Sequence, residues 1–222
     1  MNVLGMFARH PTPGKTKTRL AATSGDEAAT ELYAAFVEDL LRRCSGLADR
    51  FVAVVTPDKA ITRDWFSKRL PQGAQLWFQP EGGLGDRIEW FFQEAIQQPG
   101  DRAVLIGSDS PDLPDAIIEG AFRELDDADV VISPAGDGGF VLIGLKAASS
   151  GLFADVHWSA ATTLLDTLRA AERHQLSVQL LQPWYDVDTE ENLGTLTALQ
   201  QCRGSGAAEC PVTRGVLERV WR

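Results

Sequence analysis

The stretch NVLGMFARHPTPGKTKTRL, residues 2–20, joins a nearly continuous apolar run to a loop rich in prolines and cations. The run at residues 2–8 is short and aliphatic, as expected of a strand that is buried on both faces of a parallel sheet. Similar short apolar runs recur along the chain and are the other predicted strands, at residues 50–56, 74–79, 102–107, 129–133, 139–145 and 176–181.

Helix-periodic segments lie between these runs. Residues 27–43, 86–97 and 114–125 each place their apolar side chains on one helical face. Ser159 and Thr189 are the predicted N-caps of two later helices, Thr189 together with Asn192 three residues on. Strands that alternate with helices predict an α/β fold, a single Rossmann-like three-layer α/β/α domain with a mainly parallel sheet. Ligands of such sheets bind outside the carboxyl ends of the strands.

Length and composition agree with one large domain. The chain has 222 residues, of which 44% are hydrophobic and 23% are charged. We expect the domain to cover residues 1–202. A Gly/Ala-rich stretch at residues 203–211 would begin a C-terminal tail, 203–222, with a short helix or a contact for a partner.

Three scattered cysteines are too few for a disulfide framework and indicate a reducing compartment. The N-terminal apolar stretch lacks the flanks of a signal peptide. No apolar run approaches the roughly 20 residues of a transmembrane segment. A cytoplasmic location is therefore expected.

A formal net charge of −10 argues against a partner such as a nucleic acid polymer or an anionic membrane. The opening loop departs from this acidic character, because residues 9–19 contain no acid. Its cations are Arg9, Lys15, Lys17 and Arg19. The triplet Gly14-Lys15-Thr16 suggests a P-loop, but the first glycine of that motif would fall on Arg9, and two prolines remove backbone donors. The loop therefore predicts either cations that reach a pyrophosphate or a solvated basic turn.

A carboxylate directly follows the predicted strand 102–107, in the sequence Gly107-Ser108-Asp109-Ser110-Pro111. Carboxylate oxygens are the ligands that Mg²⁺ and Mn²⁺ prefer, commonly one or two of them together with substrate phosphates. The alternative is that Asp109 caps the next helix, as Asp112 or Asp115 could.

Three other loops could contribute residues to a ligand site at the same edge of the sheet. Asp137 lies among glycines that permit close approach of a ligand, although a simple Asp-Gly hairpin explains it nearly as well. Asp186 and Asp188 flank Val187, and we expect them to point to opposite faces, one of them to the site. Gly83 and Gly85 precede a helix in a turn that suits a base or ribose, or that is an ordinary loop.

Taken in order, these segments resemble the GT-A-like nucleotide-diphospho-sugar transferase superfamily, and more narrowly the bacterial DUF2064-type glycosyltransferase family. The resemblance covers roughly residues 1–200. It is carried by Pro13-Gly14-Lys15-Thr16-Lys17-Thr18-Arg19-Leu20, Gly83-Leu84-Gly85-Asp86-Arg87, Gly107-Ser108-Asp109-Ser110-Pro111, Asp137-Gly138-Gly139-Phe140, Trp158-Ser159 and Asp186-Val187-Asp188-Thr189.

The resemblance implies that Asp109 and Asp188 hold Mg²⁺ or Mn²⁺ and that the turn from Asp137 to Phe140 lines the acceptor or sugar side. The nucleotide and its phosphates would contact Ala8, Arg9, Gly14, Lys15, Lys17, Arg19, Gly83, Gly85, Arg87 and Ser108. Lys15, Lys17 and Arg19 would neutralise phosphate charge, and Asp137 is the candidate general base. Asp109-Ser110-Pro111 departs from the Asp-x-Asp of typical GT-A glycosyltransferases, and the first loop lacks the Gly-x-Gly-Thr-Arg of typical pyrophosphorylases.

Three functions fit these residues. The first is glycosyl transfer from a nucleotide sugar to a small-molecule acceptor. The second is nucleotidyl transfer from a nucleoside triphosphate to a phosphorylated substrate, because the basic first loop is similar in character to that of molybdenum-cofactor and phospholactate guanylyltransferases. The third is a non-catalytic nucleotide-binding subunit. A homodimer is left open.

Overall fold

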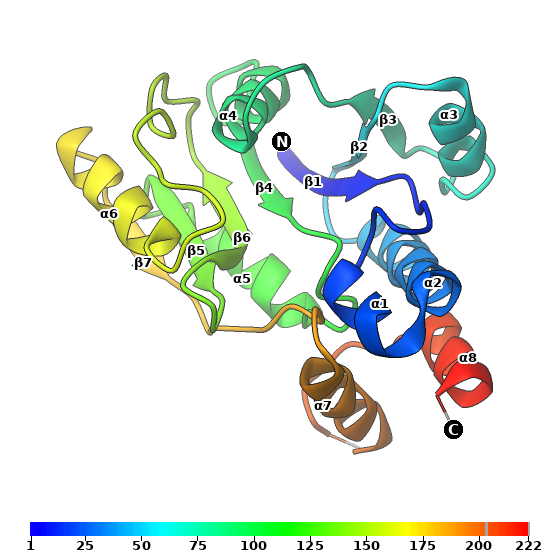
Figure 1. Ribbon diagram of the computed structural model, residues 1–222. Coiled ribbons are helices and arrows are strands. Elements are labelled where there is room, and N and C mark those ends of the chain that lie inside the picture. The colour runs from blue at the N-terminus through cyan, green and yellow to red at the C-terminus, as the bar shows by residue number, and fades with distance from the viewer. Residues whose placement is uncertain (203, 222) are drawn as a thin grey trace.

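The protein, described by a computed structural model over residues 1–202 and 204–221, has a mixed α/β fold around one twisted sheet (Figure 1). The sheet has seven strands in the order β3-β2-β1-β4-β6-β5-β7. The strands are β1 (Asn2–Arg9), β2 (Arg50–Thr56), β3 (Gln75–Phe78), β4 (Arg102–Ile106), β5 (Val130–Pro134), β6 (Phe140–Leu145) and β7 (Val178–Leu180). This confirms the predicted fold class, and every predicted strand is present within one residue of its expected bounds at either end, except β7, whose first residue is two later than expected.

Most neighbouring strands are parallel, and the exception is β6, which runs antiparallel to both β4 and β5. A tight turn joins β5 to β6, with Ala135 donating its backbone N–H to the carbonyl of Gly139. The predicted Asp-Gly hairpin is therefore present. Because β6 is reversed, this turn lies at the same edge as the carboxyl ends of the parallel strands.

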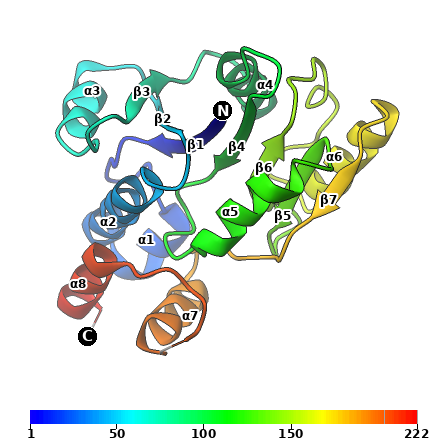
Figure 2. The ribbon, with the colours of Figure 1, turned by 180° about the vertical axis from the view of Figure 1, so that it is seen from behind.

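Helices cover both faces of the sheet. The helices are α1 (Thr18–Ser24), α2 (Asp26–Cys44), α3 (Ala60–Ser67), α4 (Leu84–Ala95), α5 (Asp115–Glu124), α6 (Thr163–Arg173), α7 (Glu190–Gln201) and α8 (Pro211–Val220). The core on one face is built from α2 and α5, and the core on the other face from α4 and α6. Figure 2 shows α2 and α5 in front of the sheet and α6 behind it.

The structure differs from the expected helices at three places. α1 and α3 were not predicted, because each buries few side chains and has no long apolar stripe. The prediction of Ser159 as an N-cap is wrong. Ser159 lies in a turn with φ of 57°, and α6 begins four residues later at Thr163, whose hydroxyl donates to backbone carbonyls of this turn. Thr189 is confirmed as an N-cap, since its hydroxyl accepts the N–H of Asn192 at 3.3 Å.

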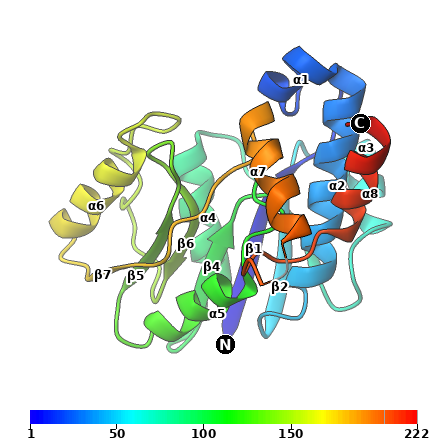
Figure 3. The same cartoon turned by 90° about the horizontal axis from the view of Figure 1, so that it is seen from below.

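Helix α8 lies within the segment that we expected to be a tail, and it packs against α2 (Figure 3). The expected boundary after residue 202 falls on Arg203, which with Arg222 lies outside the described residues. Val216 and Leu217 are buried in the core shared with α2. Asp39 of α2, only 3% exposed, accepts the backbone N–H groups of Val212 and Thr213 at 3.0 and 2.8 Å. This buried carboxylate thus supplies the partners that the first turn of α8 lacks.

Among the described helices, none combines the length and the apolar character needed to cross a bilayer.

We expect the hydrogen bonds of Asp39 to stabilise the packing of α8 against α2. Asp39→Ala should lower the free energy of unfolding by about 1–3 kcal/mol, because two helix N-terminal donors lose their acceptor. Glu31→Ala is the matched control, since Glu31 joins the same two helices through an exposed ion pair with Arg219, and it should cost less than about 1 kcal/mol. Urea unfolding followed by circular dichroism measures both, and equal losses would refute the assignment of Asp39 as the buried cap.

Candidate functional site

A cleft with a volume of about 900 Å³ opens at the carboxyl edge of the sheet. This is the edge at which ligands of open α/β sheets bind. The predicted residues that line it are Ala8, Arg9, Lys15, Lys17, Arg19, Arg87, Ser108, Asp109, Asp137 and Asp188. Residues from the N-terminal loop, from the middle of the chain and from the segment after β7 therefore meet at one cavity.

The predicted glycines lie beside the cleft and have backbone roles. Gly83 donates its N–H to Asp86 Oδ2 at 2.8 Å at the start of α4. A Cβ atom at Gly85 would lie 2.8 Å from Trp158 Nε1, so the glycine permits close packing of α4 against the Trp158 loop. Gly14 takes a turn conformation with φ of 70°. It is their neighbours Lys15, Gly82 and Leu84 that line the cleft.

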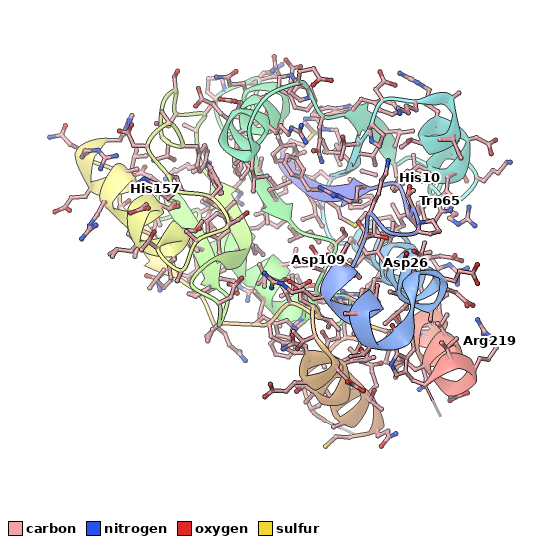
Figure 4. All side chains as sticks on the ribbon, viewed as in Figure 1. His10, Asp26, Trp65, Asp109, His157 and Arg219 are labelled. Atoms are coloured by element: carbon pink, nitrogen blue, oxygen red, sulfur yellow. The ribbon has the colours of Figure 1, made fainter. Side chains whose placement is uncertain are left out.

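The centre of the site is an ion-pair cluster around Lys17. Lys17 Nζ lies 2.5 Å from Asp109 Oδ1 and 2.9 Å from Asp188 Oδ1. The lysine side chain is 2% exposed, whereas the carboxylates are 47% and 40% exposed. Figure 4 places Asp109 between the α1 segment and the strands. Burial alone would lower the pKa of Lys17, but the charges and hydrogen bonds of the two carboxylates outweigh it and raise that pKa, so the amine carries a proton.

Asp188 reaches this cluster because the segment after β7 returns across the end of β4. The N–H of Val187 donates to the carbonyl of Asp109 at 2.8 Å, and Ser110 Oγ donates to Asp186 Oδ1 at 2.7 Å. Burial raises the pKa of Asp186 to about 6 and outweighs this hydrogen bond.

The expectation that Asp186 and Asp188 point to opposite faces is wrong, because both line the cleft. Residues two apart on an extended segment share a face. The intervening Val187 is fully buried and takes the other side.

Asp112 holds the returning segment and was not recognised as part of the scaffold. Its carboxylate is fully buried and accepts Trp184 Nε1 at 3.1 Å and Tyr185 Oη at 2.6 Å. Burial raises the pKa of Asp112 against the effect of these bonds. The residue at the N-cap of α5 is Pro114, so the capping interpretation of Asp109 and Asp112 is wrong. Asp115 lies in the first turn of α5 and pairs with Arg43.

The basic loop presents its other cations to the cleft. Arg9, Lys15 and Arg19 are exposed. Arg9 Nη1 donates to the carbonyl of Lys15 at 3.4 Å, and Arg19 Nη1 lies 3.8 Å from Asp188 Oδ2. The loop is therefore more than a solvated turn, because Lys17 points inward while its neighbours stay accessible to an anion.

Tyr33 and Ser108 form a buried pair behind this loop, and Tyr33 was missed from the sequence. Tyr33 Oη accepts the backbone N–H of Arg9 at 3.1 Å and lies 2.8 Å from Ser108 Oγ. Burial raises the pKa of Tyr33 to about 12, so the phenol keeps its proton. Either hydroxyl can donate in this pair, and when Tyr33 is the donor the Ser108 hydroxyl hydrogen is free for a ligand in the cleft. The sequence signal that could have indicated Tyr33 is its place on the apolar face of the predicted helix 27–43, where its hydroxyl needs a buried hydrogen-bond partner.

The opposite end of the cleft is formed by the β5–β6 turn and the Trp158 loop. Asp137 is exposed, and its Oδ1 accepts the N–H of Gly139 at 2.9 Å. A Cβ at Gly138 would lie 2.2 Å from the carbonyl oxygen of Ala161, so the turn packs directly on the loop. Phe140 and Trp158 meet edge to face with ring centroids 6.1 Å apart, and both line the cleft. The cavity thus has a charged end and an aromatic end.

Asp109 and Asp188 are the side chains in the cleft that could hold a divalent cation. Asp109 and Asp188 direct oxygens to one point and remain partly exposed, which fits the one or two carboxylates that Mg²⁺ takes alongside substrate phosphates. Over residues 1–202 and 204–221, no group of three or more His, Cys, Asp or Glu residues forms a metal cage. Figure 4 shows His10 and His157 away from Asp109. A metal would therefore need ligand oxygens besides those of the protein.

Comparisons with solved structures support this architecture. A candidate nucleotide-diphospho-sugar transferase from Desulfovibrio desulfuricans G20 is 30% identical with a TM-score of 0.88, over 98% of this chain and 94% of that chain. A cytidylyltransferase from Leptospira borgpetersenii serovar Hardjo-bovis (strain JB197) is 14% identical with a TM-score of 0.57, over 98% and 94% of the two chains. CMP:2-keto-3-deoxy-manno-octonic acid synthetase, complexed with CTP, is 10% identical with a TM-score of 0.55, over 90% and 98%. The last two share the fold alone.

The sequence itself also matches a protein family. The family model described as "Uncharacterized protein conserved in bacteria (DUF2064)" matches residues 41–160, whereas a search of curated proteins found no match. The matched residues include β4, Asp109 and the β5–β6 turn. On this match and on the 30% identity over nearly the whole chain, the protein belongs to the bacterial DUF2064 family.

Proposed function

We propose that this protein is a metal-dependent transferase that moves a sugar from a nucleotide-diphospho-sugar donor to a small acceptor. The observation that carries the proposal is the pair of half-exposed carboxylates, Asp109 and Asp188, gathered on one buried lysine beside three accessible cations. Such an arrangement suits a diphosphate and its metal, because phosphate charge needs several positive partners at once.

The donor's diphosphate would lie at the charged end of the cleft. Lys15 and Arg19 would supply fixed positive charge there, and the Ser108 hydroxyl would donate a hydrogen bond. Mg²⁺ or Mn²⁺, held by Asp109 and Asp188, would when bound neutralise charge that develops on the leaving diphosphate. At the aromatic end, Asp137 would accept the proton of the acceptor hydroxyl.

Nucleotidyl transfer is the second candidate, and the number of cations in the first loop favours it. A substrate phosphate would attack the α-phosphorus of a nucleoside triphosphate, and pyrophosphate would leave. The same cations would serve, because the leaving group is again a polyphosphate. A non-catalytic subunit is disfavoured, since both carboxylates and all the loop cations named above line one cleft.

A panel of nucleotide sugars and nucleoside triphosphates, each with and without Mn²⁺, tests the proposal by thermal unfolding. Ligand at 100 times its Kd stabilises by about 2.7 kcal/mol, which raises Tm by about 5–10 °C for a chain of this size. Asp109→Asn should abolish the metal-dependent part of the shift, whereas Asp155→Asn, an exposed carboxylate outside the cleft, should keep it.

The pattern of shifts separates the candidates. A metal-dependent shift with a nucleotide sugar supports glycosyl transfer, and a shift with triphosphates alone supports nucleotidyl transfer. If no nucleotide shifts Tm, both proposals are wrong.

Lys15→Ala should weaken binding of the donor about 10- to 100-fold, because it removes a charge-assisted contact to phosphate. Isothermal titration calorimetry measures this change. The control is Lys59→Ala, an exposed lysine outside the cleft, which should leave Kd unchanged. An unaltered Kd for Lys15→Ala would remove that lysine from the phosphate site.

The Tyr33–Ser108 pair predicts a non-additive double-mutant cycle. Tyr33→Phe and Ser108→Ala should each weaken donor binding by about 2- to 10-fold, the effect of one neutral hydrogen bond. The double variant should be no weaker than Ser108→Ala alone, because Tyr33 acts by orienting that hydroxyl. Calorimetric Kd values for the three variants provide the cycle, and additive losses would show that the two groups act independently.

A further inference from the structure

The side chain of Lys17 occupies the point at which the two carboxylates of the cleft converge. Its ammonium is within hydrogen-bond distance of one oxygen of Asp109 and one oxygen of Asp188. The chain therefore carries its own cation where the two negative charges meet. Lys15, from the same loop, makes no ion pair with any described residue and is exposed.

The backbone of the loop is arranged to turn this one lysine inward. Lys17 has φ of 49° and ψ of 45°, a left-handed conformation that costs free energy in a residue other than glycine, at the position just before α1. Its side chain passes Phe36 of α2, with Nζ 5.6 Å from the ring centroid. The two ion pairs offset the cost of this backbone conformation, so we expect the loop to change conformation when they are lost.

We propose that Lys17 is an exchangeable counter-ion, which holds Asp109 and Asp188 for the metal and moves to the donor's diphosphate when metal and donor arrive together. The inference rests on the proposed function and adds to it that metal and diphosphate bind cooperatively. A second cation on the same two oxygens would repel the ammonium strongly at this distance. Lys17 must therefore leave, and the nearest new anion is a diphosphate held by Lys15 and Arg19.

The exchange has a thermodynamic consequence. Without a phosphate ligand, a divalent cation must displace Lys17 from the two carboxylates with which it pairs, so the lysine loses both ion pairs and the cation binds weakly. With a diphosphate present, the carboxylates and the lysine each receive a new partner. Metal and diphosphate should thus bind cooperatively, and the coupling must be reciprocal.

The test is Mn²⁺ binding to the nucleotide-free protein, measured by calorimetry on the wild type and on Lys17→Met. Methionine keeps an unbranched apolar chain and removes the charge. Lys17→Met should bind Mn²⁺ at least about tenfold more tightly than the wild type, a difference of about 1.4 kcal/mol. Lys15→Met is the matched control for a general loss of positive charge and should change the affinity less than about threefold. Adding Asp109→Asn to Lys17→Met should abolish the gain.

A second measurement uses the wild type alone, so the inference stays testable if Lys17→Met does not fold. The Tm shift produced by Mn²⁺ and pyrophosphate together should exceed the sum of the shifts produced by each alone. If Mn²⁺ alone stabilises the wild type as much as the pair does, or binds it as tightly as Lys17→Met, the exchange is refuted while the proposed function stands. If nucleotides stabilise the protein but Mn²⁺ affects neither the wild type nor Lys17→Met, the metal assignment itself is refuted.

Discussion

The buried ammonium of Lys17 joins three segments that are far apart in the sequence. One is the loop after β1, the second begins where β4 ends, and the third returns from β7 to Asp188. A charge removed from water needs partners that are themselves fixed in place. The packing around the cleft can be understood as the means by which two carboxylates are brought to this one lysine.

The returning segment shows how that placement is achieved. Asp112 accepts hydrogen bonds from two aromatic side chains of the segment, and the N–H of Val187 pairs with the carbonyl of Asp109. Arg43 adds bonds to the carbonyls of Pro111 and Leu113, so the loop that carries Asp109 is anchored from α2 as well. Both carboxylates of the cluster therefore belong to backbone that has little freedom, as a preorganised site requires.

Much of this arrangement could be predicted because local chemistry determines it. Short β-branched and aliphatic runs such as residues 50–56 are typical of buried strands, and a polar residue directly after such a run, as at Asp109, is then expected at the edge of the sheet. The contact between Tyr33 and Ser108 spans 75 positions and has no local signature. Helices α1 and α3 bury too few side chains to show a periodic apolar stripe in the sequence. The inward direction of Lys17 depends on its own left-handed backbone conformation, which the residue type does not indicate.

The single antiparallel strand, β6, gives the carboxyl edge of the sheet a loop of a different kind. The loops that follow the other parallel strands lead into helices and are tied to the packing of whole layers. The β5–β6 turn connects two neighbouring strands and carries no helix, so its length can change without altering the sheet's register. This turn lies at the part of the cleft where we propose the acceptor, and it is separate in the chain from the loop cations that we propose for the diphosphate. On the proposed function, changes in this hairpin would therefore alter the choice of acceptor while leaving the donor site unchanged.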